Sequence, residues 1–210
     1  MRLLTKRIFQ VAKGIMTKVD NKKQIAREKS IERIRNSAIH LFSKNGFSAT
    51  TMEMIAKHAK VSKGLAYNYF KSKNQIFESI LNDYLSKQEA LNAGISTNQA
   101  AVDYLRELFQ KTLEFLVQER KTLILLTICK FQPNSLILSK KMTENIEKRF
   151  APYHEAMKDR FKKLGIADPE LEMLYVKTFF HGLIMSQCTD NDVYPKHQIV
   201  EIFLSRYTGK

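Results

Sequence analysis

Residues 50–73 read TTMEMIAKHAKVSKGLAYNYFKSK. In this stretch Thr50, Ser62 and Ser72 are of the types that cap helix N-termini, because their hydroxyl oxygens accept a hydrogen bond from a free backbone N–H group. Thr50 and Ser72 are each followed three residues later by Glu or Gln, which is the spacing of a capping box. Three helix starts within 23 residues predict two very short helices joined by tight turns. That arrangement is typical of a helix-turn-helix.

The flanking sequence predicts helices throughout the chain. Apolar residues recur at helical spacing over long stretches, and only seven glycines and four prolines are present, which disfavours a β-sandwich or a barrel. We therefore expect an all-α fold. The expected helices cover about residues 25–44, 51–60, 63–70, 73–85, 98–119, 123–131, 134–164, 169–188 and 195–207.

Single residues are expected to begin, bend or end these helices. Ser96 with Gln99 has the spacing of another capping box, and Asp168 followed by proline is typical of a helix start. Pro152 is expected to kink or break the helix around it. Lys60 occupies a turn where glycine is common, so we expect a non-glycine residue in the left-handed conformation there.

The positive charge of the chain is concentrated near its N-terminal end. The formal net charge is +14, of which residues 1–27 carry +7 and residues 28–74 carry +6, whereas residues 75–210 carry +1. A basic segment joined to an almost neutral body predicts one part that binds a polyanion and another part with a different task. We expect a basic N-terminal extension over residues 1–27, a helix-turn-helix DNA-binding domain over residues 28–74, and a helical regulatory and dimerisation domain over residues 75–210.

The basic extension allows three interpretations. Its apolar residues fall on one helical face with lysines and arginines around them: Leu3, Leu4, Ile8, Val11 and Ile15. This pattern suits a basic arm that contacts DNA, or a helix that lies on a membrane surface. Alternatively, Met16 is the natural start and residues 1–15 lie upstream of it. The segment lacks the apolar core and cleavage site of a secretory signal, and no window of about 18 apolar residues predicts membrane insertion.

The sequence lacks the motifs of common enzymes and metal proteins. It has no nucleophile elbow, no phosphate-binding loop and no His-Glu-x-x-His motif, and its five histidines and two cysteines show no metal-ligand spacing. We therefore expect no catalytic residue, no metal and no cofactor. The alternatives to a DNA-binding regulator are an enzyme, a helical adaptor or membrane-surface protein, and a DNA binder that responds to no ligand.

The stretches over residues 50–56 and 61–73 closely resemble the DNA-binding signature of TetR-family regulators. The resemblance is specific over about residues 28–85, and beyond residue 90 it extends only to several long helices. It implies about nine helices, with an N-terminal three-helix helix-turn-helix domain and a larger ligand-binding and dimerisation domain. It also implies a bacterial, cytoplasmic repressor that binds double-stranded DNA at a palindromic operator as a homodimer. A small hydrophobic or amphipathic ligand would release it.

By this resemblance, the short helix that begins near residue 63 enters a major groove, where each base pair presents its own pattern of donors and acceptors. Ser62 and Gly64 are small enough to let the backbone approach the DNA. The resemblance places Lys63, Leu65 and Asn68 toward the bases. The Asn68 amide suits adenine, and the Leu65 side chain suits a thymine methyl group.

Phosphate contacts are expected on both sides of that helix. Thr51 and Met52 begin the preceding helix, where free backbone N–H groups favour an anion. Lys71 and Lys73 flank the start of the following helix and are expected to grip the DNA backbone. Tyr67 and Tyr69 resemble positions that contact phosphates or sugars. The expected DNA contacts are Thr51, Met52, Ser62, Lys63, Gly64, Leu65, Tyr67, Asn68, Tyr69, Lys71 and Lys73.

Apolar residues of the C-terminal region predict a ligand pocket and a dimer interface. The pocket is expected to be lined by Phe109, Leu113, Leu116, Leu126, Phe150, Tyr153, His154, Met157 and Phe180. The helices over residues 170–188 and 195–208 are apolar around most of their circumference, so each is expected to be covered on two sides. The family resemblance implies that they pair with the same helices of a second chain, through Met173, Val176, Phe180, Ile184, Ile199 and Phe203.

Overall fold

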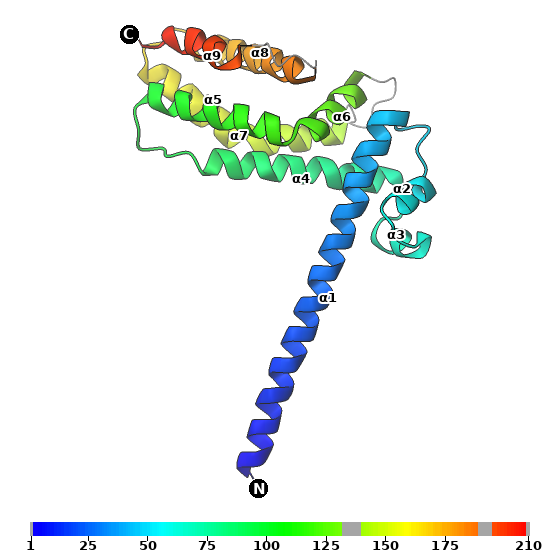
Figure 1. The fold of residues 1–210 in the computed structure, drawn as a ribbon. Coiled ribbons are helices and arrows are strands. Elements are labelled where there is room, and N and C mark those ends of the chain that lie inside the picture. The colour runs from blue at the N-terminus through cyan, green and yellow to red at the C-terminus, as the bar shows by residue number, and fades with distance from the viewer. Residues whose placement is uncertain (1, 132–139, 189–194, 209–210) are drawn as a thin grey trace. The chain divides into compact units, whose positions relative to one another are not determined.

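A computed structural model describes residues 2–131, 140–188 and 195–208, and over these residues the chain forms nine helices and no strand (Figure 1). The helices are α1 (Arg2–Asn45), α2 (Met52–His58), α3 (Lys63–Tyr69), α4 (Lys73–Ala93), α5 (Ala101–Gln118), α6 (Arg120–Phe131), α7 (Lys140–Lys163), α8 (Pro169–Cys188) and α9 (Lys196–Ser205). Residues 1–79 and residues 80–210 form two compact units. The predicted all-α fold is confirmed. None of the described helices combines the length and the apolar character that crossing a bilayer requires.

The first unit is built on the C-terminal half of α1. Ile34, Ala38 and Phe42 repeat at helical spacing and are buried on one face of that helix. α1 packs on α2, and α2 packs on α3. Phe47, which follows α1, contacts Phe42 and the α4 residue Phe77, with ring centroids 4.9 and 5.8 Å apart. These rings join the end of α1 to the start of α4.

The start predicted for the first helix is wrong, because α1 begins at Arg2 rather than near residue 25. The prediction relied on the apolar face over residues 31–42, which is the part of α1 that packs. Every side chain over residues 21–29 is exposed, yet the helix continues through them. Helix propagation needs no packed face, since each added residue contributes a backbone hydrogen bond and only nucleation is strongly unfavourable. Figure 1 shows α1 as one uninterrupted helix that extends beyond α2 and α3.

Thr51, and not Thr50, caps α2. The Thr51 hydroxyl oxygen accepts a hydrogen bond from the Met54 N–H group at 3.2 Å. Thr50 is fully buried, and its hydroxyl donates to the carbonyl oxygen of Gly46 at 2.8 Å. The capping box predicted from Thr50 to Glu53 is therefore wrong, because the Thr50 hydroxyl satisfies a carbonyl just after α1 instead.

The other local features predicted for this unit are present. The Ser62 hydroxyl accepts a hydrogen bond from the backbone N–H three residues later at 3.1 Å, as an N-cap does. Ser72 accepts one from the Gln75 N–H group at 3.2 Å, and the Gln75 side chain accepts in return from the Lys71 N–H group at 2.7 Å. Lys60 has a φ of 54°, so it takes the left-handed conformation expected at that turn.

The second unit has a large apolar core. α5 packs on α9, and α6 and α7 each pack on α8. Its largest fully buried side chains are Leu105, Phe109, Leu116, Leu125, Phe161, Leu183 and Tyr207. The sequence predicted a kink or a break at Pro152; α7 continues through this residue as one helix, so a break is excluded. Buried residues on both sides of the proline, Phe150 and Met157, belong to the same core. Residues 132–139, where the sequence predicted the start of this helix, lie outside the described residues.

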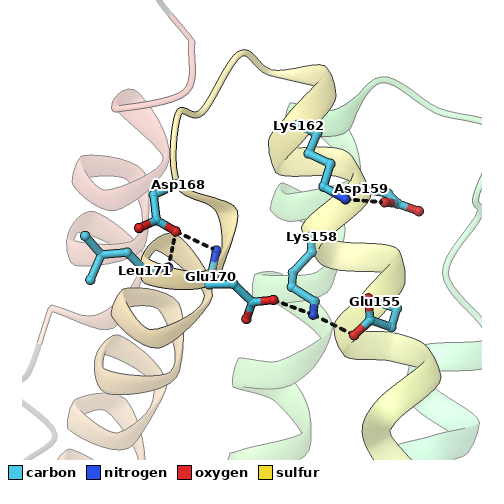
Figure 2. Close-up of polar contacts among 7 residues, drawn as sticks. All are labelled: Glu155, Lys158, Asp159, Lys162, Asp168, Glu170 and Leu171. Atoms are coloured by element: carbon cyan, nitrogen blue, oxygen red, sulfur yellow. Dashed lines mark hydrogen bonds and ion pairs between the residues drawn. The ribbon is translucent and has the colours of Figure 1, made fainter.

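The two helix starts predicted in this unit had different outcomes. α5 begins at Ala101 with no side-chain cap, and the Gln99 side chain donates instead to Glu107 at 2.7 Å, so the start predicted at Ser96 is wrong. The start of α8 is confirmed, because Asp168 accepts hydrogen bonds from the Glu170 and Leu171 N–H groups at 3.1 and 3.0 Å (Figure 2).

An ion-paired lysine links α7 to α8 beside that start. The Lys158 ammonium donates to Glu155 at 2.6 Å and to Glu170 at 2.8 Å (Figure 2). Hydrogen bonds with Glu155 and then Glu170 raise the pKa of Lys158, because both carboxylates stabilise its charged form. The lysine therefore stays charged and bridges the two helices at neutral pH.

Candidate nucleic-acid interface

α3 has one buried face and one exposed face. Ala66 is fully buried, whereas Lys63, Tyr67 and Asn68 are exposed and Leu65 is half-buried. The pattern follows the helical period, since Gly64 and Asn68 are each two residues from Ala66, which places them on nearly the opposite side of the helix. The side chains predicted to face a groove are thus accessible to a partner.

Gly64 has no role in packing the chain itself. A Cβ atom placed there would meet no atom within 4 Å, and the residue has no positive φ that would require glycine. Because glycine is a poor helix former, the fold alone favours a larger residue at this position. A bare backbone on the exposed face of α3 instead suits close approach of an external surface, as the sequence predicted.

Lys63 forms an ion pair with Glu53 of α2. The Nζ and Oε2 atoms are 3.3 Å apart, and both side chains are largely exposed, at 60% and 73%. Ion pairs this exposed contribute little stability. The Lys63 ammonium is therefore available to exchange its carboxylate partner for a phosphate or a base.

The residues predicted at the start of α2 differ in exposure. Thr51 is exposed, whereas the Met52 side chain is buried at 8% exposure. Met52 can therefore offer a partner its backbone N–H group but not its side chain.

Lys73 is engaged by the main chain. Its ammonium donates to the carbonyl oxygens of Phe47 at 2.8 Å, Ser48 at 2.9 Å and Thr50 at 3.1 Å, and it lies 4.7 Å from the centroid of the Phe47 ring. A lysine ammonium has three N–H donors, and all three are used here. The phosphate contact predicted for Lys73 therefore does not fit the structure. Lys73 instead ties the connection between α1 and α2 to the first residue of α4.

Lys71 and Tyr69 remain suited to phosphate contacts. Lys71 is exposed and donates to one carbonyl, that of Tyr67 at 3.2 Å. Tyr69 is half-buried, and the Arg27 guanidinium of α1 lies 6.0 Å from the centroid of its ring. Neither the main-chain role of Lys73 nor the position of Arg27 beside α3 was predicted from the sequence. No sequence pattern separates Lys73 from Lys71, since both are lysines next to a helix start.

The residues predicted to line a ligand pocket lie in or against the core of the second unit. Phe109, Leu113, Leu116, Phe150 and Met157 are buried, and Leu126, Tyr153, His154 and Phe180 are half-buried. Phe109 stacks on Phe180 with ring centroids 4.5 Å apart, and Phe150 lies beside Tyr153 at 6.1 Å. Burial lowers the pKa of His154, and the nearby charges of Lys177 and Lys158 lower it further. The His154 imidazole is therefore neutral near pH 7.

Half of the residues predicted for a dimer interface are buried within their own chain. Met173, Val176 and Phe203 are buried, and Phe180, Ile184 and Ile199 are half-buried. The large apolar side chains that α8 and α9 expose are Leu171, Leu174, Tyr175, Met185 and Ile202. Both faces of α8 and of α9 carry apolar residues, so periodicity alone could not separate the side chains that pack inside the chain from those that stay exposed.

A short helix with an exposed polar face follows a second short helix across a tight turn, in a unit that carries nearly all of the net positive charge. These features define a helix-turn-helix DNA-binding protein. Residues 34–80 match the model of the bacterial regulatory proteins of the tetR family.

Two transcriptional regulators are similar in sequence to most of the chain. It is 34% identical over 159 residues to YhgD, an uncharacterized HTH-type transcriptional regulator of Bacillus subtilis, covering 72% of this chain and 80% of YhgD. It is 26% identical over 166 residues to IcaR of Staphylococcus aureus, the negative transcriptional regulator of the biofilm operon icaADBC, covering 74% of this chain and 85% of IcaR. The chain belongs to the TetR family and is a DNA-binding transcriptional regulator.

A solved structure has the same fold. AibR, in complex with isovaleryl coenzyme A and operator DNA, superposes with a TM-score of 0.65 at 16% sequence identity, covering 84% of this chain and 97% of AibR.

We predict that Lys73→Met destabilises the protein, whereas Lys71→Met does not. Losing three charge-assisted hydrogen bonds to carbonyls should lower the free energy of unfolding by about 2 kcal/mol or more. Urea denaturation followed by circular dichroism measures both variants. Equal stability of the two variants would contradict a main-chain role for Lys73.

Gly64→Ala should separate stability from DNA binding. We expect the free energy of unfolding to stay constant or rise slightly, because alanine favours the helix and meets no neighbour. Affinity for duplex DNA should fall roughly tenfold, since the added methyl group holds the backbone away from the groove. Fluorescence anisotropy measures the affinity, and an unchanged value would show that α3 does not approach DNA at Gly64.

Proposed function

We propose that the chain is a repressor of the bacterial cytoplasm that binds an inverted-repeat operator as a homodimer and leaves it when a small hydrophobic or amphipathic ligand binds. The observation that carries this proposal is the exposed face of α3, on which Lys63, Tyr67 and Asn68 are accessible while Ala66 anchors the helix. This face belongs to the part of the chain that holds almost all of the net charge.

On DNA, the exposed face of α3 would lie in a major groove. Asn68 can form two hydrogen bonds to an adenine edge, Leu65 can contact a thymine methyl group, and Lys63 can reach guanine or a phosphate. Tyr67, Tyr69 and Lys71 would contact the sugar-phosphate backbone and fix the register of α3 without reading sequence. Gly64 and Ser62 would let the backbone come close.

The proposed dimer interface uses the outer faces of α8 and α9. The exposed fraction is 63% for Leu171, 59% for Leu174 and 70% for Ile202. In a dimer these apolar side chains would be removed from water, which favours association. Half-buried neighbours such as Phe180 and Ile184 would complete the surface. A two-fold dimer presents two α3 helices related by the same axis, which matches the symmetry of an inverted repeat.

Ligand release is proposed to act through the second unit. The candidate ligand contacts are apolar residues of its core with two polar groups on α7, Tyr153 and His154. A ligand that stabilises a conformation with a different spacing of the two α3 helices would shift the population away from operator binding.

Two of the similar proteins support the proposal that the chain represses transcription and responds to a ligand. IcaR is named a negative transcriptional regulator, and AibR was solved with both a coenzyme A ester and operator DNA. Repression and ligand response are proposed for this chain on that similarity together with its own geometry.

The proposal is tested by selecting duplexes from a random pool with the purified protein and sequencing those that are retained. We expect an inverted repeat whose two halves are about one helical turn or more apart. Retention of all duplexes without any enriched sequence would reject an operator-binding repressor.

Asn68→Ala should change which sequences are selected. We expect the preference at one position of each half-site to relax, corresponding to about 1–3 kcal/mol of discrimination. Asn74→Ala is the matched control, because Asn74 is an exposed asparagine of the same unit on α4. An unchanged motif for Asn68→Ala would show that this amide does not read a base.

Leu174→Asp should separate the dimer into monomers, because a charge on the outer face of α8 would be buried without a partner on association. Val117→Asp on α5 is the control, since Val117 is similarly exposed, at 54% against 59% for Leu174. Sedimentation velocity gives the mass of each variant. A dimer that persists in Leu174→Asp would place the interface elsewhere.

A further inference from the structure

The N-terminal half of α1 is a basic helix whose described side chains, those from residue 21 onward to residue 29, lie in solvent. All side chains over residues 21–29 are exposed, including Lys22, Lys23 and Arg27. Residues 1–27 contain eight lysines and arginines and one acid, so the segment cannot neutralise its own charge. The function proposed above accounts for α3 and for α8 and α9, but it gives this half of α1 no task.

One contact places this segment beside the proposed DNA-reading helix. The Arg27 guanidinium lies 6.0 Å from the ring centroid of Tyr69, the last residue of α3. Both residues belong to the first unit. The basic half of α1 therefore lies next to α3 at Arg27, and toward the N-terminus it extends away from α3. Figure 1 shows that continuation as a straight helix with no helix of the same unit alongside.

The length of the segment sets its reach. At a rise of 1.5 Å per residue, residues 2–27 span about 39 Å. With one base pair per 3.4 Å, this corresponds to roughly 11 base pairs of B-DNA. An α3 helix seated in a groove would therefore bring a positively charged rod within reach of phosphates outside its own half-site.

We propose that the basic N-terminal half of α1 binds the phosphates of duplex DNA that flanks the operator. This inference rests on the proposed function, since it needs α3 to be on DNA. Phosphate contacts carry no base information, so the segment adds affinity and salt dependence without changing the selected sequence. The operator alone then provides only part of the binding surface.

The test compares two duplexes, the selected operator alone and the same operator with about 15 base pairs of flanking DNA on each side. The full-length wild-type protein is compared with the double variant Lys22→Gln/Lys23→Gln, since glutamine keeps the helix propensity and removes the charge. Lys162→Gln/Lys163→Gln is the matched control, because these exposed neighbouring lysines lie at the end of α7 in the other unit. Lys22→Arg/Lys23→Arg restores the charge.

We expect the wild-type protein to bind the flanked duplex roughly tenfold more tightly than the bare operator, and its salt dependence to be steeper on the flanked duplex. The Gln pair should lose part of this preference, with the slope of log K against log salt on the flanked duplex reduced by about 2. The Arg pair and the α7 control should behave as wild type.

An equal loss for the Gln pair on both duplexes, or no loss on either, would overturn the inference. A third arm uses vesicles of phosphatidylglycerol and phosphatidylcholine. If the Gln pair lost vesicle binding while its preference for flanked DNA was unchanged, the partner of this segment would be an anionic membrane and the inference would be wrong. If wild type bound neither duplex better than competitor DNA, the proposed function itself would fail, which is a separate result.

Discussion

A helix of seven residues is too short to be stable in water by itself, so α3 keeps its shape only through the contacts around it. Its Ala66 side is buried, its first turn is capped by the Ser62 hydroxyl, and α2 packs against it. Behind them, the Lys73 ammonium gathers three carbonyl oxygens of the connection between α1 and α2 and fixes that connection to α4. Because stability comes from these inner contacts, the outer face of α3 can carry residues that the fold does not need, such as Gly64 and Asn68. Reading DNA requires this separation, since a base-reading residue must be free to match the operator.

The two units have different surface chemistry. Residues 1–74 hold nearly all of the net charge, whereas the second unit is close to neutral and exposes large apolar side chains on α8 and α9. A basic surface attracts a polyanion over a distance, and an apolar surface favours association with another protein surface. The homodimeric regulator proposed for this chain needs both properties in one chain. The long basic α1 extends the first of them beyond the helix-turn-helix.

Local patterns in the sequence were enough to predict the all-α fold, the caps at Ser62 and Asp168, and the left-handed Lys60, because each depends on residues close in the chain. The predictions that needed distant contacts were less successful. Thr50 and Thr51 are both able to cap α2, and the carbonyl groups of Gly46 and Leu41 around the Thr50 hydroxyl decide that Thr50 turns inward. The position of Lys73 beside a helix start suggested a phosphate ligand, whereas its ammonium donates to three carbonyl oxygens. Met173 and Val176 lie on a helix that is apolar around most of its circumference, so which face is buried in its own chain depends on tertiary packing.

The central claim is that α3 lies in a major groove and reads bases there. A crystal structure of the protein bound to its selected duplex tests this most directly. The account predicts α3 inside the major groove of each half-site, with the Asn68 amide within hydrogen-bond distance of a base edge and the Lys73 ammonium still on its three carbonyls. A complex in which the duplex contacts other surfaces while α3 stays exposed to solvent would contradict it.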